Sequence, residues 1–135
     1  MLGKGSIVAL KGPLGAGKTC FAKGIARGLG VAEEVTSPTY TIVSEYAAIL
    51  AAASPTLLYH IDAYRLKGSD DFISIGGEEL LFSDGITLIE WSERIEDLIP
   101  PEALVVEIEI RPGDERFISL QKKGQIMGRG AGGSA

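Results

Sequence analysis

The sequence has little cysteine, no asparagine and no long apolar run. Cys20 is the only cysteine in 135 residues, so no disulfide can form within the chain and a reducing cytoplasm is the expected location. No apolar run approaches the roughly 20 residues of a membrane-spanning helix, and residues 1–5 lack the apolar core of a signal peptide. We therefore expect a cytoplasmic protein without membrane association, in which Cys20 is a small buried residue at the start of a helix.

Positive charge is also scarce. The chain carries 13 Lys and Arg residues against 18 Asp and Glu residues, which gives a formal net charge of −5 and a pI near 4.9. Proteins that bind nucleic acid by themselves are usually basic, because neutralising phosphates supplies most of their affinity. The composition therefore argues against strong binding to naked RNA or DNA, and a partner protein would have to hold any nucleic acid. The length favours one compact domain with a real core.

The most informative motif that is present is a glycine-rich loop. Residues 12–19 read G-P-L-G-A-G-K-T and match the phosphate-binding pattern G-x-x-x-x-G-K-[ST], between an apolar run at 7–10 and a helix-like run that begins at Thr19. The glycines would let backbone N–H groups surround phosphate, beside the positive end of the helix dipole. Lys18 would reach the β- and γ-phosphates and the Thr19 hydroxyl would bind Mg²⁺. The alternative is an ordinary glycine-rich turn, but the strict spacing and both flanks favour a nucleotide site. The predicted nucleotide contacts in this segment are Gly12, Leu14, Gly15, Ala16, Gly17, Lys18, Thr19 and Cys20.

Two further apolar runs end in carboxylates. Residues 57–62 end at Asp62 and residues 86–90 end at Glu90. Continuous apolar strands between helices predict an α/β fold of the P-loop NTPase type, with a mainly parallel central sheet flanked by helices. Because ligands bind at the carboxyl ends of such strands, we expect Asp62 and Glu90 to share one edge with the loop. At least one would serve the metal, and the other would hold a metal-bound water or act as general base; the residues alone leave these roles open.

The remaining segments predict the following organisation. A helix from Thr19 has a buried stripe, residues 70–81 form a helix interrupted at Gly76-Gly77, and residues 93–98 form a short helix. Residues 104–110 and 116–120 flank Pro112-Gly113-Asp114 and predict an antiparallel C-terminal hairpin. The alanine-rich stretch 47–53 is interpreted as a short helix or a flexible excursion. We place the domain at residues 1–122 and a flexible Gly-rich tail at 123–135.

Several single residues keep two interpretations. His60, inside an apolar run, is interpreted as a hydrogen-bonded core residue and not as a catalyst. Ser37 and Thr41 could form a switch that orders around γ-phosphate and Mg²⁺, or a simple Ser-Pro-Thr turn. Trp91 could pack in the core or cover the nucleotide.

The absence of asparagine limits the class of nucleotide protein. The guanine-recognition signature N-K-x-D of GTPases cannot be present, and no D-x-x-G sequence follows either carboxylate. A small-molecule kinase shares the phosphate loop and stays open as an alternative, although no Arg-rich cluster lies between Glu90 and Pro100. A nucleotide-gated binding module, in which hydrolysis is incidental, is a third possibility.

Four motifs together resemble those of one known family. They are G-x-L-G-A-G-K-T at residues 12–19, S-P-T-Y-T at 37–41, H-x-D-x-Y-R-L at 60–66 and I-E-W at 89–91. In this order they resemble the TsaE (YjeE) family, and the resemblance extends from Ser6 to about Leu120. The family is one of bacterial ATPases needed to make threonylcarbamoyladenosine beside the anticodon of tRNA.

The resemblance implies cofactors, partners and residue roles. The cofactors would be ATP and Mg²⁺. The partner would be the TsaB–TsaD heterodimer, which ATP hydrolysis would reset between turnovers, and tRNA would be met only indirectly through that complex. By position, Thr19 and Glu90 would bind Mg²⁺ with Asp62 in the catalytic centre, Thr41 would be the switch hydroxyl, and Trp91 would lie beside the nucleotide. The remaining residues implied to lie near the nucleotide are Glu93 and Arg116.

The sequence departs from the family pattern in two ways. Pro13 stands where family loops usually have an acidic residue, and it has no N–H to donate to phosphate. The chain also reaches its loop almost at once, so we expect it to lack the N-terminal helical segment that family members usually carry.

Overall fold

The computed structural model describes residues 3–13, 17–33, 43–50 and 54–124. The strands are β1 Ile7–Lys11, β2 Val43–Leu50, β3 Ser54–Asp62, β4 Ile86–Glu90, β5 Leu104–Arg111 and β6 Glu115–Lys122. The α-helices are α1 Lys18–Gly28, α2 Ser69–Ser74 and α3 Gly77–Leu81, and the 3₁₀ segments are η2 Ala63–Arg65, η3 Ser92–Leu98 and η4 Pro112–Asp114. None of the helices in these ranges is long and apolar enough to cross a membrane.

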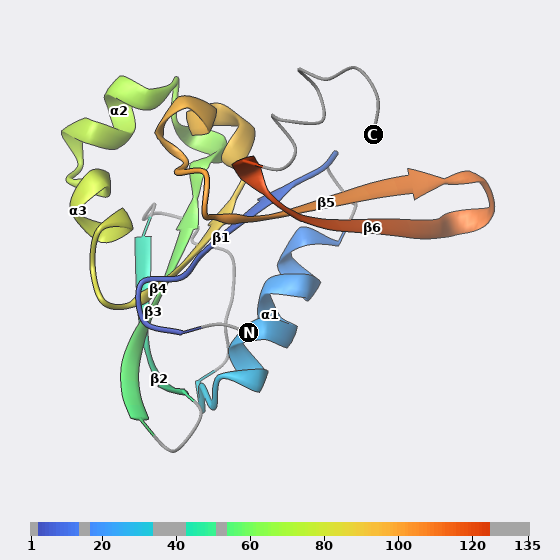
Figure 1. Cartoon of the computed structure of the whole chain (residues 1–135). Helices are drawn as coiled ribbons and strands as arrows, with labels where there is room; N and C mark the ends of the chain where they lie inside the picture. Colours follow the sequence, from blue (N-terminus) through green and yellow to red (C-terminus); the bar gives the residue numbers. More distant parts are fainter. Residues whose placement is uncertain (1–2, 14–16, 34–42, 51–53, 125–135) are drawn as a thin grey trace.

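The strands form one six-stranded sheet in the order β2-β3-β4-β1-β5-β6. β1 pairs in parallel with β4 and β5, and β3 pairs in parallel with β4. β2 and β6 are antiparallel to their neighbours. The predicted α/β fold with a mainly parallel sheet and a C-terminal antiparallel hairpin is confirmed (Figure 1). Both hairpins extend past the strands beside them, because β1 pairs with β5 only from Leu104 to Glu107 and β4 pairs with β3 only from Leu58 to Asp62.

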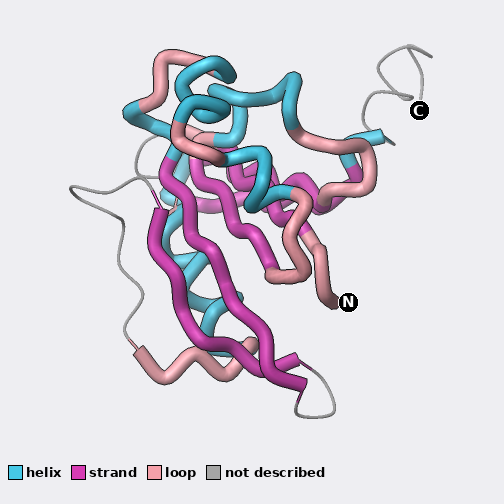
Figure 2. The backbone as a smooth tube through the Cα atoms, turned by 90° about the vertical axis from the view of Figure 1, so that its left-hand side faces the viewer, coloured by secondary structure: helices cyan, strands magenta, loops and turns pink. Residues whose placement is uncertain are grey.

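Helices cover both faces of the sheet and create two cores. α1 lies on one face, and α2, α3 and η3 lie on the other (Figures 1 and 2). Successive side chains of a strand point to opposite faces, so even- and odd-numbered strand residues separate into the two cores. The α1 core includes Val8, Leu10, Ala22, Ala26, Leu88 and Val106, and the opposite core includes Ala9, Ile61, Phe72, Ile89, Ile95 and Val105.

The alanine-rich stretch corrects one expectation. Ala47 to Leu50 is neither a helix nor an excursion but the second half of β2, paired with β3 from Ala47–Leu57 to Leu50–Ser54. Alanine has little strand preference of its own, and the cross-strand partner decides its conformation. Tyr46 and Ala48 are buried while the residues beside them are exposed, as expected for a half-buried strand. The rest of the predicted stretch, residues 51–53, lies outside the described residues.

Two other expectations concern helix boundaries and the tail. The interruption at Gly76-Gly77 is confirmed, since α2 ends before Gly76, which has a φ of +80°. At the C-terminal end, Lys123 is buried and its ammonium donates to the carbonyls of Glu96 and Ile99. Lys123 therefore packs against the domain, and residues 125–135, most of the predicted tail, lie outside the described residues.

Candidate functional site

The start of α1 places the lysine and threonine of the glycine-rich loop at the carboxyl end of β1. Gly12 and Gly17 have φ values of +150° and +101°, which side-chain-bearing residues rarely adopt. Gly17 is the N-cap of α1 and its carbonyl accepts a hydrogen bond from Phe21. Lys18 and Thr19 therefore follow directly from a turn that requires glycine. Leu14, Gly15 and Ala16 lie outside the described residues.

The Lys18 ammonium is buried in the site. It donates to the carbonyl oxygens of Gly12 and, at 3.0 Å, of Pro13, and it lies 3.6 Å from the centroid of a Trp91 ring. Burial lowers the pKa of Lys18, while the negative charges of Glu93, Glu90 and Asp62 act in the opposite direction. A nearly buried cation faced by three carboxylates is typical of a functional site.

Glu90 is the best-defined carboxylate of the group. It ends β4, which lies between β1 and β3, so Glu90 is in register with Leu10 on one side and Asp62 on the other. Its side chain is buried, with Oε1 accepting from the Thr19 hydroxyl at 3.0 Å and Oε2 lying 2.6 Å from His60 Nε2. Glu90 therefore lies at the same edge as Lys18 and Thr19, as expected, and accepts a hydrogen bond from Thr19.

Asp62 stands beside Glu90 in a different environment. It is half-buried, and its Oδ1 accepts the backbone N–H of Tyr64 at 3.0 Å, which caps η2. One carboxylate oxygen is thus used locally. The prediction that Asp62 and Glu90 lie together at the loop's edge holds, and the strand order places Glu90 nearer to β1.

Trp91 has a strained backbone. Its φ of +59° is the only positive value of a non-glycine residue in the part of the chain described, and such a conformation for a bulky side chain is uncommon and costly. The Trp91 ring contacts Tyr64 with centroids 4.9 Å apart, and the Arg94 guanidinium lies 5.4 Å from the Tyr64 ring. Lys18, Trp91, Tyr64 and Arg94 therefore form a continuous row of cation–π and aromatic contacts at this edge.

The other predicted residues are placed less centrally. Glu93 is exposed in the first turn of η3 and acts on Lys18 through its charge. Arg116 is exposed on the projecting hairpin, in register with Ile110, beyond the last β5 residue that pairs with β1. Ser37 and Thr41 lie outside the described residues.

Cys20 corrects a second expectation, because its side chain is exposed. The buried residues of α1 are Lys18, Ala22 and Ala26, which repeat every four residues along one side of the helix. Cys20 is two positions from its nearest buried neighbours and so points away from them. The start of a helix next to a core was not enough to predict burial.

Sequence reasoning missed two members of the site. It placed His60 in the core, which its burial confirms, but not against Glu90, and it assigned no role to the Tyr64 ring beside Trp91. The available signal was strand alternation, which places His60 and Asp62, two apart on β3, on one face; the register that pairs Glu90 with Asp62 comes from the structure. All three side chains must therefore share one face of the sheet.

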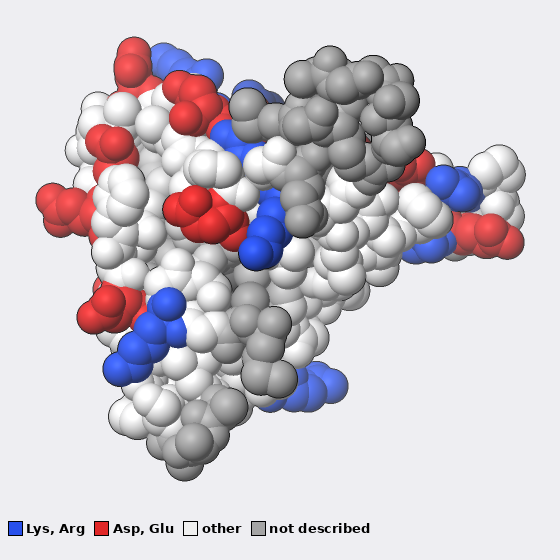
Figure 3. Space-filling view, in the orientation of Figure 1, with Lys and Arg blue, Asp and Glu red and all other residues white. Residues whose placement is uncertain are grey.

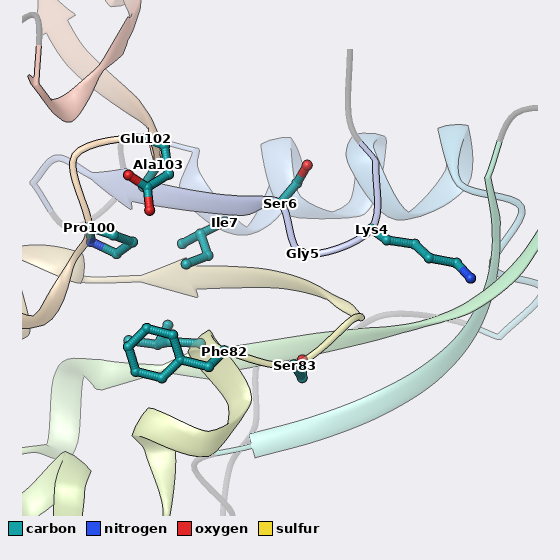
Figure 4. A pocket seen from close by; sticks show the side chains of 10 residues that line it. Lys4, Gly5, Ser6, Ile7, Phe82, Ser83, Pro100, Glu102 and Ala103 are labelled. Atoms are coloured by element: carbon teal, nitrogen blue, oxygen red, sulfur yellow. The ribbon is translucent and has the colours of Figure 1, made fainter.

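A separate pocket lies at the opposite end of the parallel strands from the Lys18 site. It has a volume of about 380 Å³ and is formed around the residues that precede β1, β4 and β5 (Figure 4). Phe82 borders it and is exposed to 79%. This position is the amino end of the parallel strands, so the pocket is distinct from the Lys18 site.

Fold and site together define a class of protein. It is an α/β protein whose mainly parallel sheet presents a glycine-bounded strand–loop–helix segment, a buried lysine and two strand-end carboxylates at its carboxyl edge.

Comparison with known proteins gives the family. A family model described as "Threonylcarbamoyl adenosine biosynthesis protein TsaE" matches residues 1–118, so the chain belongs to the TsaE family. Two similar relatives, from Treponema pallidum (strain Nichols) and Bacillus subtilis (strain 168), are both named "tRNA threonylcarbamoyladenosine biosynthesis protein TsaE". Each is 41% identical over 120 residues, or 89% of this chain, and the match covers 84% of the first relative and 72% of the second. The crystal structure of Bacillus subtilis YdiB is also similar, with a TM-score of 0.66 and 35% identity, over 93% of this chain and 74% of that one.

Proposed function

We propose that this protein is a Mg²⁺-dependent ATPase that takes part in the threonylcarbamoyladenosine modification of tRNA, together with a TsaB–TsaD heterodimer. The proposed ATPase activity is supported chiefly by the position of Glu90. Its carboxylate is buried between the Thr19 hydroxyl and His60, beside the ammonium of Lys18. The biosynthetic role is supported by the family and by the names of the relatives.

The oxygen donors at the site suit Mg²⁺ bound to a nucleotide. Magnesium keeps several waters and takes substrate phosphates, so one or two protein ligands are sufficient. Thr19 Oγ1 and Glu90 Oε1 provide two such oxygens 3.0 Å apart. Within the described ranges no three His, Cys, Asp or Glu side chains form an all-protein metal cage, and a phosphate-bound Mg²⁺ does not need one.

Each residue of the site has a role in this proposal. The ammonium of Lys18 would leave the carbonyls of Gly12 and Pro13 to bind the β- and γ-phosphates. Thr19 and Glu90 would hold Mg²⁺, which would neutralise charge on the phosphates. Asp62, with one oxygen left by its cap, would orient the attacking water and accept its proton. The Trp91 ring would lie beside the nucleotide and keep bulk water from Lys18.

The proposed route to tRNA is indirect. The chain has a net charge of −5, and Asp and Glu side chains gather over the side of the molecule that carries α2 and α3, with Lys and Arg spread in small groups (Figure 3). Among the described residues on this face, Lys and Arg do not form a continuous basic surface that could follow a phosphate backbone. The partner proteins would therefore hold the tRNA.

The first experiment tests the chemistry. Purified protein is assayed for phosphate release from ATP with and without Mg²⁺, alone and with TsaB and TsaD. We expect Lys18→Ala and Glu90→Ala to abolish Mg²⁺-dependent turnover, while the exposed controls Lys122→Ala and Glu107→Gln retain it. Normal turnover in folded Glu90→Ala protein would refute the metal role, and transfer of the γ-phosphate to a metabolite would indicate a kinase.

The second experiment tests the biological role. TsaB and TsaD are mixed with the tagged protein, with and without ATP, and the retained proteins and tRNA modification are measured. We expect nucleotide-dependent retention and modification over repeated cycles. Repeated cycles supported by a hydrolysis-dead variant would favour a nucleotide-gated binding module.

A further inference from the structure

We propose that His60 is a positioning residue that holds the Glu90 carboxylate in the orientation needed to bind the Mg²⁺–nucleotide complex. The inference rests on the proposed function, since it takes Glu90 as a metal ligand. It assigns His60 a task beyond filling the core.

The two oxygens of Glu90 are held by two different elements. Thr19 of α1 donates to Oε1 at 3.0 Å, and His60 of β3 contacts Oε2 at 2.6 Å. A glutamate has three side-chain torsions, and a carboxylate held from one side only would keep part of this freedom. Contacts on both oxygens fix the plane of the carboxylate, and the oxygen that contacts Thr19 is then presented toward the start of α1.

The hydrogen bond also defines the tautomer of His60. An ionised carboxylate can only accept hydrogen bonds, so the hydrogen between the two groups must be on Nε2. In the neutral ring Nδ1 is then an acceptor, and this atom is buried with no hydrogen-bond partner in the described part of the chain.

This arrangement is unfavourable for a residue that serves packing alone. His60 is fully buried, and its neighbours on the same face include Leu58 and Leu88. An apolar side chain could fill that volume without burying a nitrogen that no described residue pairs with. What an apolar side chain could not do is donate to Glu90. Residues that hydrogen-bond metal ligands commonly change metal affinity by 10- to 100-fold when removed.

The test uses substitutions that move or remove the donor. The amide nitrogen of His60→Gln occupies a position similar to Nε2, that of His60→Asn is closer to Nδ1 and too short to reach Glu90, and His60→Leu has no donor. Mg²⁺ affinity is measured by titrating Mg²⁺ into protein saturated with ADP, and ADP affinity is measured separately without Mg²⁺. Ile108→Ala, buried on the same face but in β5, controls for loss of core stability.

We expect His60→Leu and His60→Asn to weaken Mg²⁺ binding by about 10- to 100-fold, with little change in ADP affinity without Mg²⁺. His60→Gln should recover most of the Mg²⁺ affinity. Ile108→Ala should keep the wild-type Mg²⁺ affinity even if its thermal midpoint falls as far as those of the His60 variants. Folded His60→Leu protein with normal Mg²⁺ affinity would overturn the proposal, as would equal affinities of the Gln and Asn variants.

A second measurement needs only the wild-type protein. His60 is the only histidine in the chain, so its ring ¹⁵N signals are unambiguous. We expect the Nε2–H tautomer, with a signal that shifts when Mg²⁺ joins the nucleotide; an Nδ1–H tautomer would refute the inference even if every variant fails to fold.

Glu90→Gln separates this inference from the proposed function. If it leaves Mg²⁺ affinity unchanged, the metal role of Glu90 fails and the His60 inference fails with it. If Glu90→Gln weakens Mg²⁺ binding and His60→Leu does not, only the His60 inference fails.

Discussion

Gly77→Ala should destabilise the protein, although alanine favours helices and Gly77 begins a helix. A Cβ at position 77 would collide with three atoms of the Phe72 ring. Phe72 is fully buried and packs with Ile61 and Ile89, the residues that precede Asp62 and Glu90. The ring therefore has no free space to move into, and insertion of a methyl group into such a core typically costs about 1–3 kcal/mol.

The gain in helix propensity does not cancel this cost. It is worth up to about 1 kcal/mol in a helix interior, and Gly77 is the first residue of a five-residue helix, where less of it applies. A net loss of roughly 1–2 kcal/mol remains, which corresponds to a fall in Tm of about 3–10 °C for a domain of this size.

The matched control is Gly24→Ala in α1. A Cβ at Gly24 meets no atom within 4 Å, and the residue is exposed inside the helix. The same chemical change should therefore stabilise the protein by roughly 0.5–1 kcal/mol. Urea and thermal unfolding should show a loss of stability for Gly77→Ala and a gain for Gly24→Ala.

The double variant Phe72→Leu/Gly77→Ala tests whether the collision with the Phe72 ring causes the loss of stability. Leucine removes the ring, so the two changes should be less costly together than the sum of the single variants, with a coupling of about 0.5–3 kcal/mol. Gly77→Ala protein as stable as wild type would refute the reasoning, and so would strict additivity in the double variant.

Three further predictions concern the site itself. Burial lowers the pKa of Lys18. Between this lowered pKa and the ordinary value of 10.5, the unfolded chain binds more protons than the folded protein, so the free energy of unfolding should rise with pH in that window. Lys18→Met should remove this rise when urea unfolding is measured from pH 7 to 10.5. Asp62→Ala should cost about 1 kcal/mol by removing the cap on Tyr64 N, whereas Asp62→Asn should keep that stability but lose ATP turnover, and equal stability of the two variants would contradict the cap. Trp91 is the only tryptophan and lies under the Lys18 ammonium, so Lys18→Ala should change its fluorescence emission, and an unchanged spectrum would argue against the cation–π contact.

The parts of the fold that could be predicted are those encoded locally. The apolar runs that end in Asp62 and Glu90 are continuous, and continuous runs between helices are typical of parallel strands. The strand–loop–helix segment around Lys18 has its own spacing, and the hairpin of β5 and β6 has its own turn. The second half of β2 has no such local signal, because its pairing partner in β3 supplies the strand conformation.

The contacts inside the site depend on the register between neighbouring strands, which no local pattern of the sequence specifies. His60 reaches Glu90 because Asp62 pairs with Glu90. A slip of one residue between β3 and β4 would turn these side chains to opposite faces. The positive φ of Trp91 was equally hidden, since nothing about a Trp after an apolar run indicates a left-handed conformation.

Register also bears on the two carboxylates, whose roles the residues alone leave open. Glu90 is on the strand beside β1, and both of its oxygens have contacts, one of them with the Thr19 hydroxyl. Such a fully held carboxylate is suited to a fixed ligand and poorly suited to receive a proton. Asp62 is one strand further from β1, half-buried, with one oxygen used by the cap on Tyr64. Its other oxygen is the one that an attacking water could use, so the proposal gives metal binding to Glu90 and the base role to Asp62.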